Sequence, residues 1–219
     1  MRRALKGRTL TAARRRGKQL LLDTDDGAGP VLGVHLGMSG RVLIDGEEAG
    51  DPLIYASNRH VPEWVRFGLR FGDGGALALR DPRRLGAVEL DPDEDRLGPD
   101  ALTLTKRELD PVLTKSRAPL KAVLMDQSRV AGLGNLLVDE ALWRAGLDPA
   151  RSAASLDAEE RRTLHRAIRD TVRVLGRRGG SHTGDNPRDL DVPCPREGAA
   201  LIRRTVGGRT TFSCPVHQH

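Results

Sequence analysis

Two cysteines near the end of the chain begin short motifs that could hold a metal ion. Cys194 starts the run CPRE and Cys214 starts CPVH, so Glu197 and His217 each occupy a fourth place. Between them, the run VGGR at 206–209 indicates a hairpin turn joining two short strands. Paired motifs that close a hairpin suit tetrahedral zinc, which stabilises segments too small to bury a core. We therefore expect zinc to be held by Cys194, Cys214 and His217, with Glu197 as a weaker ligand.

Two alternatives to this zinc site stay open on the sequence. His219 is a spare candidate ligand. A metal-free hairpin would depend on apolar packing by Leu201, Ile202, Val206 and Phe212. Two cysteines do not imply a disulfide framework, and a reducing compartment favours metal binding or burial over a bridge.

A glycine-rich break in the middle of the chain could bind an anion. In the run VAGLGN at 130–135, Gly132 and Gly134 permit backbone angles closed to other residues, and Asn135 stands where a helix begins. Free backbone N–H groups at a helix start, beside an amide donor, suit a phosphate oxygen. The alternative is that these glycines only end one helix and start the next.

The elements that must position these residues change character near the acidic, proline-containing stretch 91–99. Before it, the apolar runs 18–23 and 31–36 predict strands. Alternation over 65–71, a turn and the run 76–79 predict a hairpin. The segment 45–62 lacks periodicity and is expected to be a surface loop. The first part of the chain is therefore expected to be rich in β-structure.

After this divide, the spacing of apolar residues becomes helical. Asp157 and Glu160 form a capping-box signature, and an apolar stripe continues to Leu175. Mostly off that stripe lie Arg161, Arg162, Arg166, Arg169 and Arg173. One helix face is thus expected to pack and the other to be basic, while the Gly-, Asp- and Pro-containing segment 181–193 indicates a linker.

The overall charge favours a polyanionic partner. The 219 residues carry a net charge of +6, and aromatic residues make up only 3%, so aliphatic side chains must fill the core. The first eighteen residues contain no acidic residue and eight cations, namely Arg2, Arg3, Lys6, Arg8, Arg14, Arg15, Arg16 and Lys18. Such a run is hard to neutralise internally and suits a phosphate backbone, although a solvated basic face is the simpler alternative. No membrane-spanning run or signal peptide is evident, so we expect a cytoplasmic monomer.

The run DQSRVAGLGNLLVDEALWRAGLDP at 126–149 resembles the helix-two-turn-helix of the formamidopyrimidine-DNA glycosylase and endonuclease VIII family. The resemblance implies an α+β fold with three parts. These are a truncated, incomplete β-sandwich domain (1–95), a helix-two-turn-helix DNA-binding domain (96–180), and a linker with a zinc-finger-like β-hairpin (181–219). In the family the hairpin carries four cysteines, so Glu197 and His217 are departures, and Arg209 stands where its turn presents an arginine to DNA.

Three further motifs resemble those of the family. RRRGKQLLL at 14–22 implies that Lys18 reaches a DNA phosphate. HLGMSG at 35–40 supplies Met38, and DPRRLG at 81–86 supplies Arg83 and Leu85, at places where family members fill the gap left by an everted nucleotide. Flipping a base costs a few kcal/mol, and a flexible thioether with a planar cation can partly refill the void. Leu85 departs from the aromatic residue usual in one branch, so we expect weaker stacking there.

The resemblance also implies a chemistry, DNA glycosylase and AP (apurinic or apyrimidinic site) lyase activity. In the family, an N-terminal proline amine attacks the sugar carbon that bears the damaged base, and a neighbouring glutamate assists. This chain begins Met1-Arg2-Arg3. Either its start has been placed too far downstream of a complete enzyme, or it is a shortened relative that binds lesions. A Lys amine of lowered pKa can also form a Schiff base, which makes Lys18 a candidate nucleophile.

We therefore expect a base-excision repair protein that recognises damaged bases or abasic sites in double-stranded DNA. The alternative is a non-catalytic lesion-binding or general nucleic-acid-binding module. Met38 and Arg83 discriminate between these, because a general binder has no use for side chains that fill a void. Equal affinity for abasic and intact duplex at matched salt would remove lesion recognition.

Overall fold

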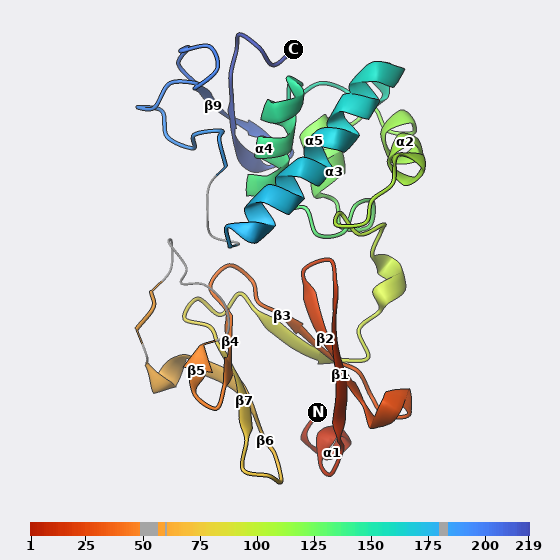
Figure 1. The fold of residues 1–219 in the computed structure, drawn as a ribbon, viewed down its shortest axis with the longest axis vertical. Coiled ribbons are helices and arrows are strands. Elements are labelled where there is room, and N and C mark those ends of the chain that lie inside the picture. The colour runs from red at the N-terminus through yellow and green to blue at the C-terminus, as the bar shows by residue number, and fades with distance from the viewer. Residues whose placement is uncertain (49–56, 60, 180–183) are drawn as a thin grey trace. The chain divides into compact units, whose positions relative to one another are not determined.

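The computed structural model describes residues 1–48, 57–59, 61–179 and 184–219. They form two compact units, one spanning Met1–Glu94 and the other Asp95–Arg178 with 184–219. Each unit has its own apolar core. Figure 1 shows the elements of both units.

The first unit contains two four-stranded antiparallel sheets among its described residues. One sheet has the order β1 (Leu10–Arg16), β2 (Gln19–Thr24), β3 (Leu32–His35), β8 (Ala87–Leu90). The other has the order β5 (Glu47–Glu48), β4 (Arg41–Ile44), β7 (Ala76–Arg80), β6 (Val65–Arg70). A short helix, α1 (Arg2–Leu5), precedes them. Leu22, Leu32 and Val34 of the first sheet share a core with Leu77 and Leu79 of the second, so the unit is sandwich-like.

The strands expected at 18–23, 31–36, 65–71 and 76–79 are confirmed, with end points shifted by at most one residue. Strand β1 was not foreseen, because its residues are mostly exposed and three of its seven are arginines, so it shows no apolar alternation. The expected loop at 45–62 contains the short strand β5 and a single 3-10 turn, Pro62–Trp64, while 49–56 and 60 lie outside the described residues.

The second unit is helical. It contains α2 (Lys106–Thr114), α3 (Leu120–Met125), α4 (Asn135–Ala145) and α5 (Ala158–Arg177). Leu109, Leu124, Leu142 and Ile168, one from each helix, are fully buried in a single core. The predicted capping box of Asp157 and Glu160 is confirmed at the start of α5, where both reciprocal hydrogen bonds form.

A two-stranded hairpin, β9 (Ile202–Val206) and β10 (Arg209–Ser213), packs on α4 in the same unit. Its turn residues Gly207 and Gly208 have φ values of 58° and 73°, which confirms the expected tight turn. A Cβ on Gly207 would lie 2.9 Å from the Cβ of Ala122, so the tip of the hairpin sits directly on α3. Among the described helices, none has the length and apolar character needed to cross a membrane.

Candidate functional site

Two neighbouring loops of the first unit are built around one buried carboxylate. Asp81, only 1% exposed, accepts hydrogen bonds from Ser39 Oγ at 2.6 Å and Gly86 N–H at 2.6 Å. The N–H of Arg83 adds a longer one at 3.3 Å. Burial raises the pKa of Asp81, but the hydrogen bonds from Ser39 and three backbone N–H groups outweigh it, so the pKa lies below its ordinary value. The carboxylate is therefore charged at neutral pH and ties the loop 36–40 to the loop 81–86.

The backbones of these two loops, which we call the loop pair, are in contact. Gly37 has a φ of 61°, and a Cβ there would lie 2.5 Å from the carbonyl carbon of Leu85. The side chains at the centre of each loop point outward instead: Met38 is 54% exposed, Leu85 is 47% exposed, and Arg83 is exposed. The structure thus brings these three sequence-predicted residues onto one locally rigid element.

Lys18 lies at the same end of the first sheet. It occupies the turn between β1 and β2, and the neighbouring Gln19 pairs with His35, the last residue of β3 before the loop pair. The pKa of His35 is lowered by burial and, secondarily, by the positive charge of Lys18. The exposed Lys18 and the loop pair therefore share one end of the β-sandwich.

The expectation that the basic N-terminal run lacks internal neutralisation is wrong, as Arg8 and Arg14 show. Arg14 forms ion pairs with Asp23 at 2.9 Å and Glu94 at 2.6 Å, and Arg8 pairs with Asp25 at 2.7 Å. These carboxylates come from later segments that the folding of the sheet brings alongside β1. The hydrogen bonds from Arg14 lower the pKa of Glu94, consistent with a stable pair. Local charge counting therefore overstated the cationic surface.

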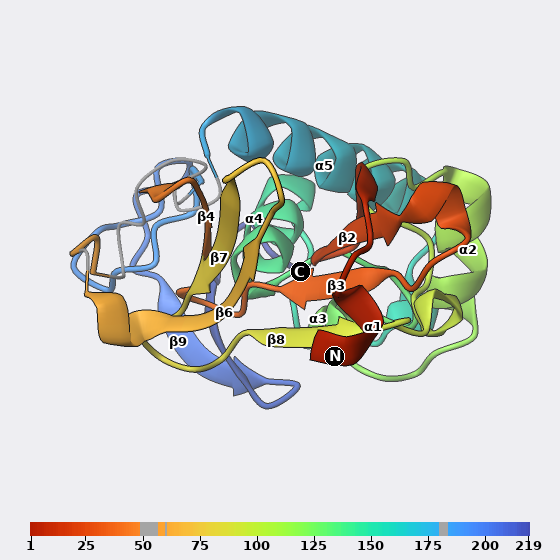
Figure 2. The same ribbon diagram turned by 90° about the horizontal axis from the view of Figure 1, so that it is seen from below.

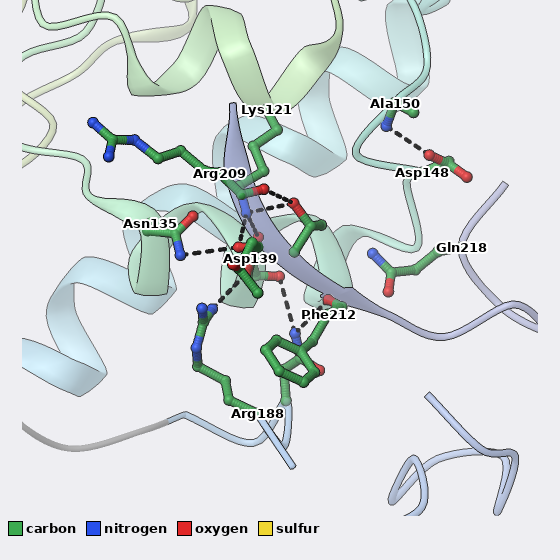
Figure 3. Close-up of polar contacts among 12 residues, drawn as sticks. Lys121, Asn135, Asp139, Asp148, Ala150, Arg188, Arg209, Phe212 and Gln218 are labelled. Atoms are coloured by element: carbon green, nitrogen blue, oxygen red, sulfur yellow. Dashed lines mark hydrogen bonds and ion pairs between the residues drawn. The ribbon is translucent and has the colours of Figure 1, made fainter. Parts of the chain in front are cut away.

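Asn135 is the first residue of α4, with Gly134 as the N-cap, so the helix starts where the glycine-rich run predicted. Among the described residues, no side chain forms a capping hydrogen bond at this start, so the N–H groups of its first turn have no such partner. The Asn135 amide has a partner that the sequence did not reveal: its Nδ2 donates to the carbonyl of Thr210 on β10 at 3.0 Å (Figure 3). Asn135 therefore also holds the hairpin beside the helix start.

A buried ion-pair cluster, which the sequence analysis missed, fixes the hairpin to α3 and α4 (Figure 3). Lys121 is fully buried, and its Nζ donates to Asp139 Oδ1 at 2.6 Å, the Thr210 carbonyl at 2.9 Å and Thr211 Oγ1 at 2.7 Å. Arg188 donates to the other oxygen of Asp139. Burial lowers the pKa of Lys121 and raises that of Asp139, and the attraction between the two opposes both shifts. All three ammonium donors are thus used for positioning.

The buried pair of Lys121 and Asp139 can be anticipated from the sequence, because each charged residue lies in an apolar run. Lys121 interrupts the apolar run 118–125, and Asp139 lies within the apolar segment 136–143. Charged residues in such runs are rarely buried unless they are paired. Arg209 directly precedes Thr210, so the cluster fixes the backbone beside it, while its own side chain is exposed and extends away from the cluster (Figure 3).

The two cysteine motifs converge on a group of three potential metal ligands. The Sγ atoms of Cys194 and Cys214 and a ring nitrogen of His217 all lie within 4.8 Å of one another. Both cysteines are buried. Cys194 Sγ is 3.7 Å from His217 Nδ1, close to the roughly 3.6 Å expected between sulfur and nitrogen ligands on one tetrahedral zinc. The donor set and its spacing therefore fit a metal ion.

The surroundings orient these ligands. His217 Nε2 lies 3.1 Å from the carbonyl of Trp143, a contact that orients the ring so that Nδ1 is directed toward the Cys194 thiol. The Trp143 indole N–H donates to Cys194 Sγ at 3.4 Å, and Arg196 stacks on the Trp143 ring at 4.2 Å. Glu197 lies outside the group of three, with its carboxylate oxygen 4.0 Å from His217 Nδ1.

This combination of a β-sandwich, a helix-two-turn-helix and a hairpin with cysteine motifs defines a class of DNA-repair proteins that bind damaged duplexes. The structure superposes on Lactococcus lactis Fpg in complex with abasic-site DNA with a TM-score of 0.80 at 26% identity, covering 99% of this chain and 84% of the other. With the MutM (Fpg) protein of Thermus thermophilus, the TM-score is 0.77 at 32% identity, covering 97% and 84%.

Sequence comparisons give the family. Residues 1–88 match the formamidopyrimidine-DNA glycosylase N-terminal domain, and residues 97–185 match the formamidopyrimidine-DNA glycosylase H2TH domain. The formamidopyrimidine-DNA glycosylase of Paracoccus denitrificans is 36% identical over 244 aligned positions, covering 98% of this chain and 84% of that protein. The chain therefore belongs to the formamidopyrimidine-DNA glycosylase family, whose members are DNA glycosylases and AP lyases.

Proposed function

We propose that this protein recognises damaged bases or abasic sites in double-stranded DNA and acts on them in the cytoplasm as a DNA glycosylase and AP lyase. Family membership supports the reaction class. The observation that carries lesion recognition is the loop pair. A buried, charged Asp81 organises a backbone from which two large apolar side chains, Met38 and Leu85, project into solvent.

In this proposal Met38, Arg83 and Leu85 occupy the space left by the everted nucleotide. The exposure of Met38 and Leu85 supports this role, because apolar side chains that leave water and enter a base stack lower the free energy of the complex. Arg83 adds a planar cation that can stack on or donate to the orphaned base.

The proposed phosphate contacts are Lys18, Asn135 and Arg209. Lys18 is supported by its exposed turn at the loop-pair end of the sandwich. Asn135 is supported by the uncapped start of α4, where backbone N–H groups and the second amide hydrogen can donate to a phosphate oxygen. Arg209 is supported by its exposed position at a hairpin turn whose backbone is fixed.

We further propose that the metal is zinc, held by Cys194, Cys214 and His217. When bound, zinc would supply structural stabilisation of the hairpin rather than reaction chemistry. The exposed Glu197 carboxylate lies beside His217 Nδ1 but outside the group of three, so it can complete the site only if its side chain rotates toward the two cysteine sulfurs. His219, also exposed, is the alternative fourth ligand.

Affinity for abasic and intact duplexes of equal length, measured by fluorescence anisotropy at one salt concentration, tests the proposal. We expect abasic DNA to bind more tightly, and Met38→Ala with Arg83→Ala to reduce that preference about tenfold or more, since base eversion costs a few kcal/mol. Arg70→Ala, at an exposed position of β6, is the matched control and should leave the preference intact. Equal affinity of the unaltered protein for both duplexes would support a general nucleic-acid-binding module instead.

Borohydride trapping on an abasic duplex tests the chemistry. A covalent product that disappears in Lys18→Ala would identify Lys18 as the amine nucleophile. If this chain gives no product but one appears when a Pro-Glu segment is added ahead of it, Lys18 has no catalytic role and a proline nucleophile is required.

A further inference from the structure

Helix α5 carries a line of arginines that the contacts proposed above do not use. Five exposed arginines recur at intervals of three or four residues along the helix, namely Arg162, Arg166, Arg169, Arg173 and Arg177. At about 1.5 Å of rise per residue, they extend over roughly 22 Å. We call this surface the arginine face.

The arginine face points away from the core of the helical unit. At about 100° per residue, its five members fall within roughly 80° of one another and opposite the buried residues Leu164, Ile168 and Leu175. The buried stripe packs on α4, and α4 carries the β9–β10 hairpin on its other side (Figure 2). The arginine face and the hairpin that bears Arg209 therefore look in different directions.

The charges on this face are poorly compensated. Arg162 pairs with Glu159 and Arg173 pairs with Asp170, but these pairs are exposed, and such pairs contribute little. Within the part of the chain that the structure describes, no ion pair involves Arg166, Arg169 or Arg177. Successive arginines are i, i+3 or i, i+4 neighbours, and like charges at these spacings destabilise a helix. A polyanion bound along the face would relieve that repulsion.

A groove of about 830 Å³ runs along one side of the face, between α5 and the segment that contains Leu102 and Lys106. Six of its lining residues are cationic, and five of those are the arginines of the arginine face, whereas Asp170 is its single carboxylate. Guanidinium groups bind phosphate oxygens bidentately, which favours arginine over lysine at phosphate contacts.

We propose that the arginine face is a second DNA-binding surface, which contacts the phosphate backbone of a duplex segment other than the one bound at the lesion. Protein partners bind through an apolar centre ringed by polar residues, and this face instead presents an unbroken line of cations with Leu102 and Val172 at one side. Duplex DNA carries one charge per about 1.7 Å of axis, so a segment as long as this line offers roughly thirteen phosphates, more than enough for five arginines. Contacts of this kind are independent of sequence and of damage.

The test uses the whole chain with its first site occupied. The protein is saturated with a short abasic duplex, and a labelled intact duplex is then titrated in at low salt while anisotropy is followed. We expect the intact duplex to bind, and the triple variant Arg166→Gln, Arg169→Gln, Arg173→Gln to lose at least tenfold in that second affinity. The triple variant should bind the abasic duplex within about threefold of the unaltered protein. For the intact duplex, the slope of log affinity against log salt concentration should fall in magnitude by roughly two to three, one per lost phosphate contact.

The matched control is Arg70→Gln, Arg107→Gln, Arg117→Gln, which removes the same charge from exposed positions outside the groove. It should leave the second affinity within about threefold. Unaltered melting temperatures of both variants verify that glutamine is tolerated.

Three results would overturn this inference. They are no second duplex bound by the unaltered protein, equal loss in both triple variants, or binding of polyglutamate at the face in preference to DNA. Failure of the proposed lesion recognition is a different result, because the first site would then bind abasic and intact duplexes with equal affinity.

Discussion

Replacement of Asp81 by asparagine should disrupt the loop pair. The carboxylate accepts from Ser39 and Arg83 through one oxygen and from Gly86 through the other. Asparagine keeps a single acceptor, so its NH₂ group must face either the Ser39 hydroxyl or the Gly86 N–H. With the NH₂ group toward Gly86, two donors oppose each other at that 2.6 Å contact. With the NH₂ group toward Ser39, whose hydroxyl can accept, the Arg83 N–H faces a donor instead.

The size of the effect follows from these contacts. A hydrogen bond to a charged group contributes about 1.5–3 kcal/mol, and an unsatisfied buried donor costs about 1–3 kcal/mol. In either orientation one donor loses its acceptor and the remaining contacts lose the charge of theirs, so the first unit should be destabilised by about 3 kcal/mol. For a unit of this size, 1 kcal/mol corresponds to about 4–8 °C, so the unit should melt roughly 10 °C lower or more.

Tryptophan fluorescence can follow the unfolding of this unit alone. The chain has two tryptophans, and Trp64 lies in the first unit whereas Trp143 lies in the second, so a Trp143→Phe background isolates Trp64. The control is Asp73→Asn, at an exposed turn. Asp81→Asn should also lose the preference for abasic over intact DNA, whereas Asp73→Asn should keep it. A melting point within about 2 °C of the parent, or full retention of that preference, would refute the role assigned to Asp81.

The pH dependence gives a second readout of the same contact. The pKa of Asp81 is lowered by folding from its ordinary value of 3.8, so its stabilising contribution is complete above that value and is lost as the pH falls through the folded-state pKa. The stability difference between parent and Asp81→Asn should therefore be constant above about pH 5 and shrink below about pH 4. A difference that stays unchanged at about pH 3 would contradict a charged Asp81.

Three further changes test the second unit. Lys121→Met should destabilise it by about 3–5 kcal/mol in thermal unfolding, because it leaves the buried Asp139 carboxylate with one partner fewer, and adding Asp139→Leu should recover part of the loss. Purified protein should contain about one zinc per chain after mild dialysis, and His217→Ala should abolish it; elemental analysis that finds no zinc in the parent would end the metal proposal. Arg209→Ala should weaken binding to all duplexes alike and lower the salt slope by about one, and an unchanged slope would exclude a phosphate contact.

The elements most accessible to sequence reasoning were those with a local signal. The capping box at Asp157 and Glu160 needs only residues three apart, and the strands with buried faces carry apolar runs. Strand β1 lacked both signals, because pairing with β2 stabilises it while its side chains face solvent. Its arginines suggested an uncompensated cationic run, and only the fold revealed that Asp23 and Glu94 neutralise Arg14.

The candidate site divides in the same way. Met38, Arg83 and Cys194 could be named from motifs, but what holds them could not, since those contacts join distant segments. Ser39 is 42 positions from Asp81 in the chain, and Lys121 is 90 from Thr211. Pairing between polar residues so far apart has no periodicity for a sequence to display.

The distribution of these long-range contacts explains how a hairpin this small can hold a fixed position in the second unit. Its tip is fixed where Gly207 meets Ala122, its middle where Thr210 and Thr211 accept from Lys121, and its base where Cys214 and His217 lie against Trp143. A two-stranded hairpin alone is marginally stable in water. Because a backbone segment that is already ordered loses less entropy on binding, attachment at three levels lowers the cost of the phosphate contact proposed for Arg209. Zinc removal and Lys121→Met should therefore each weaken DNA binding although neither alters a proposed DNA contact, and together they should weaken it more than either does alone.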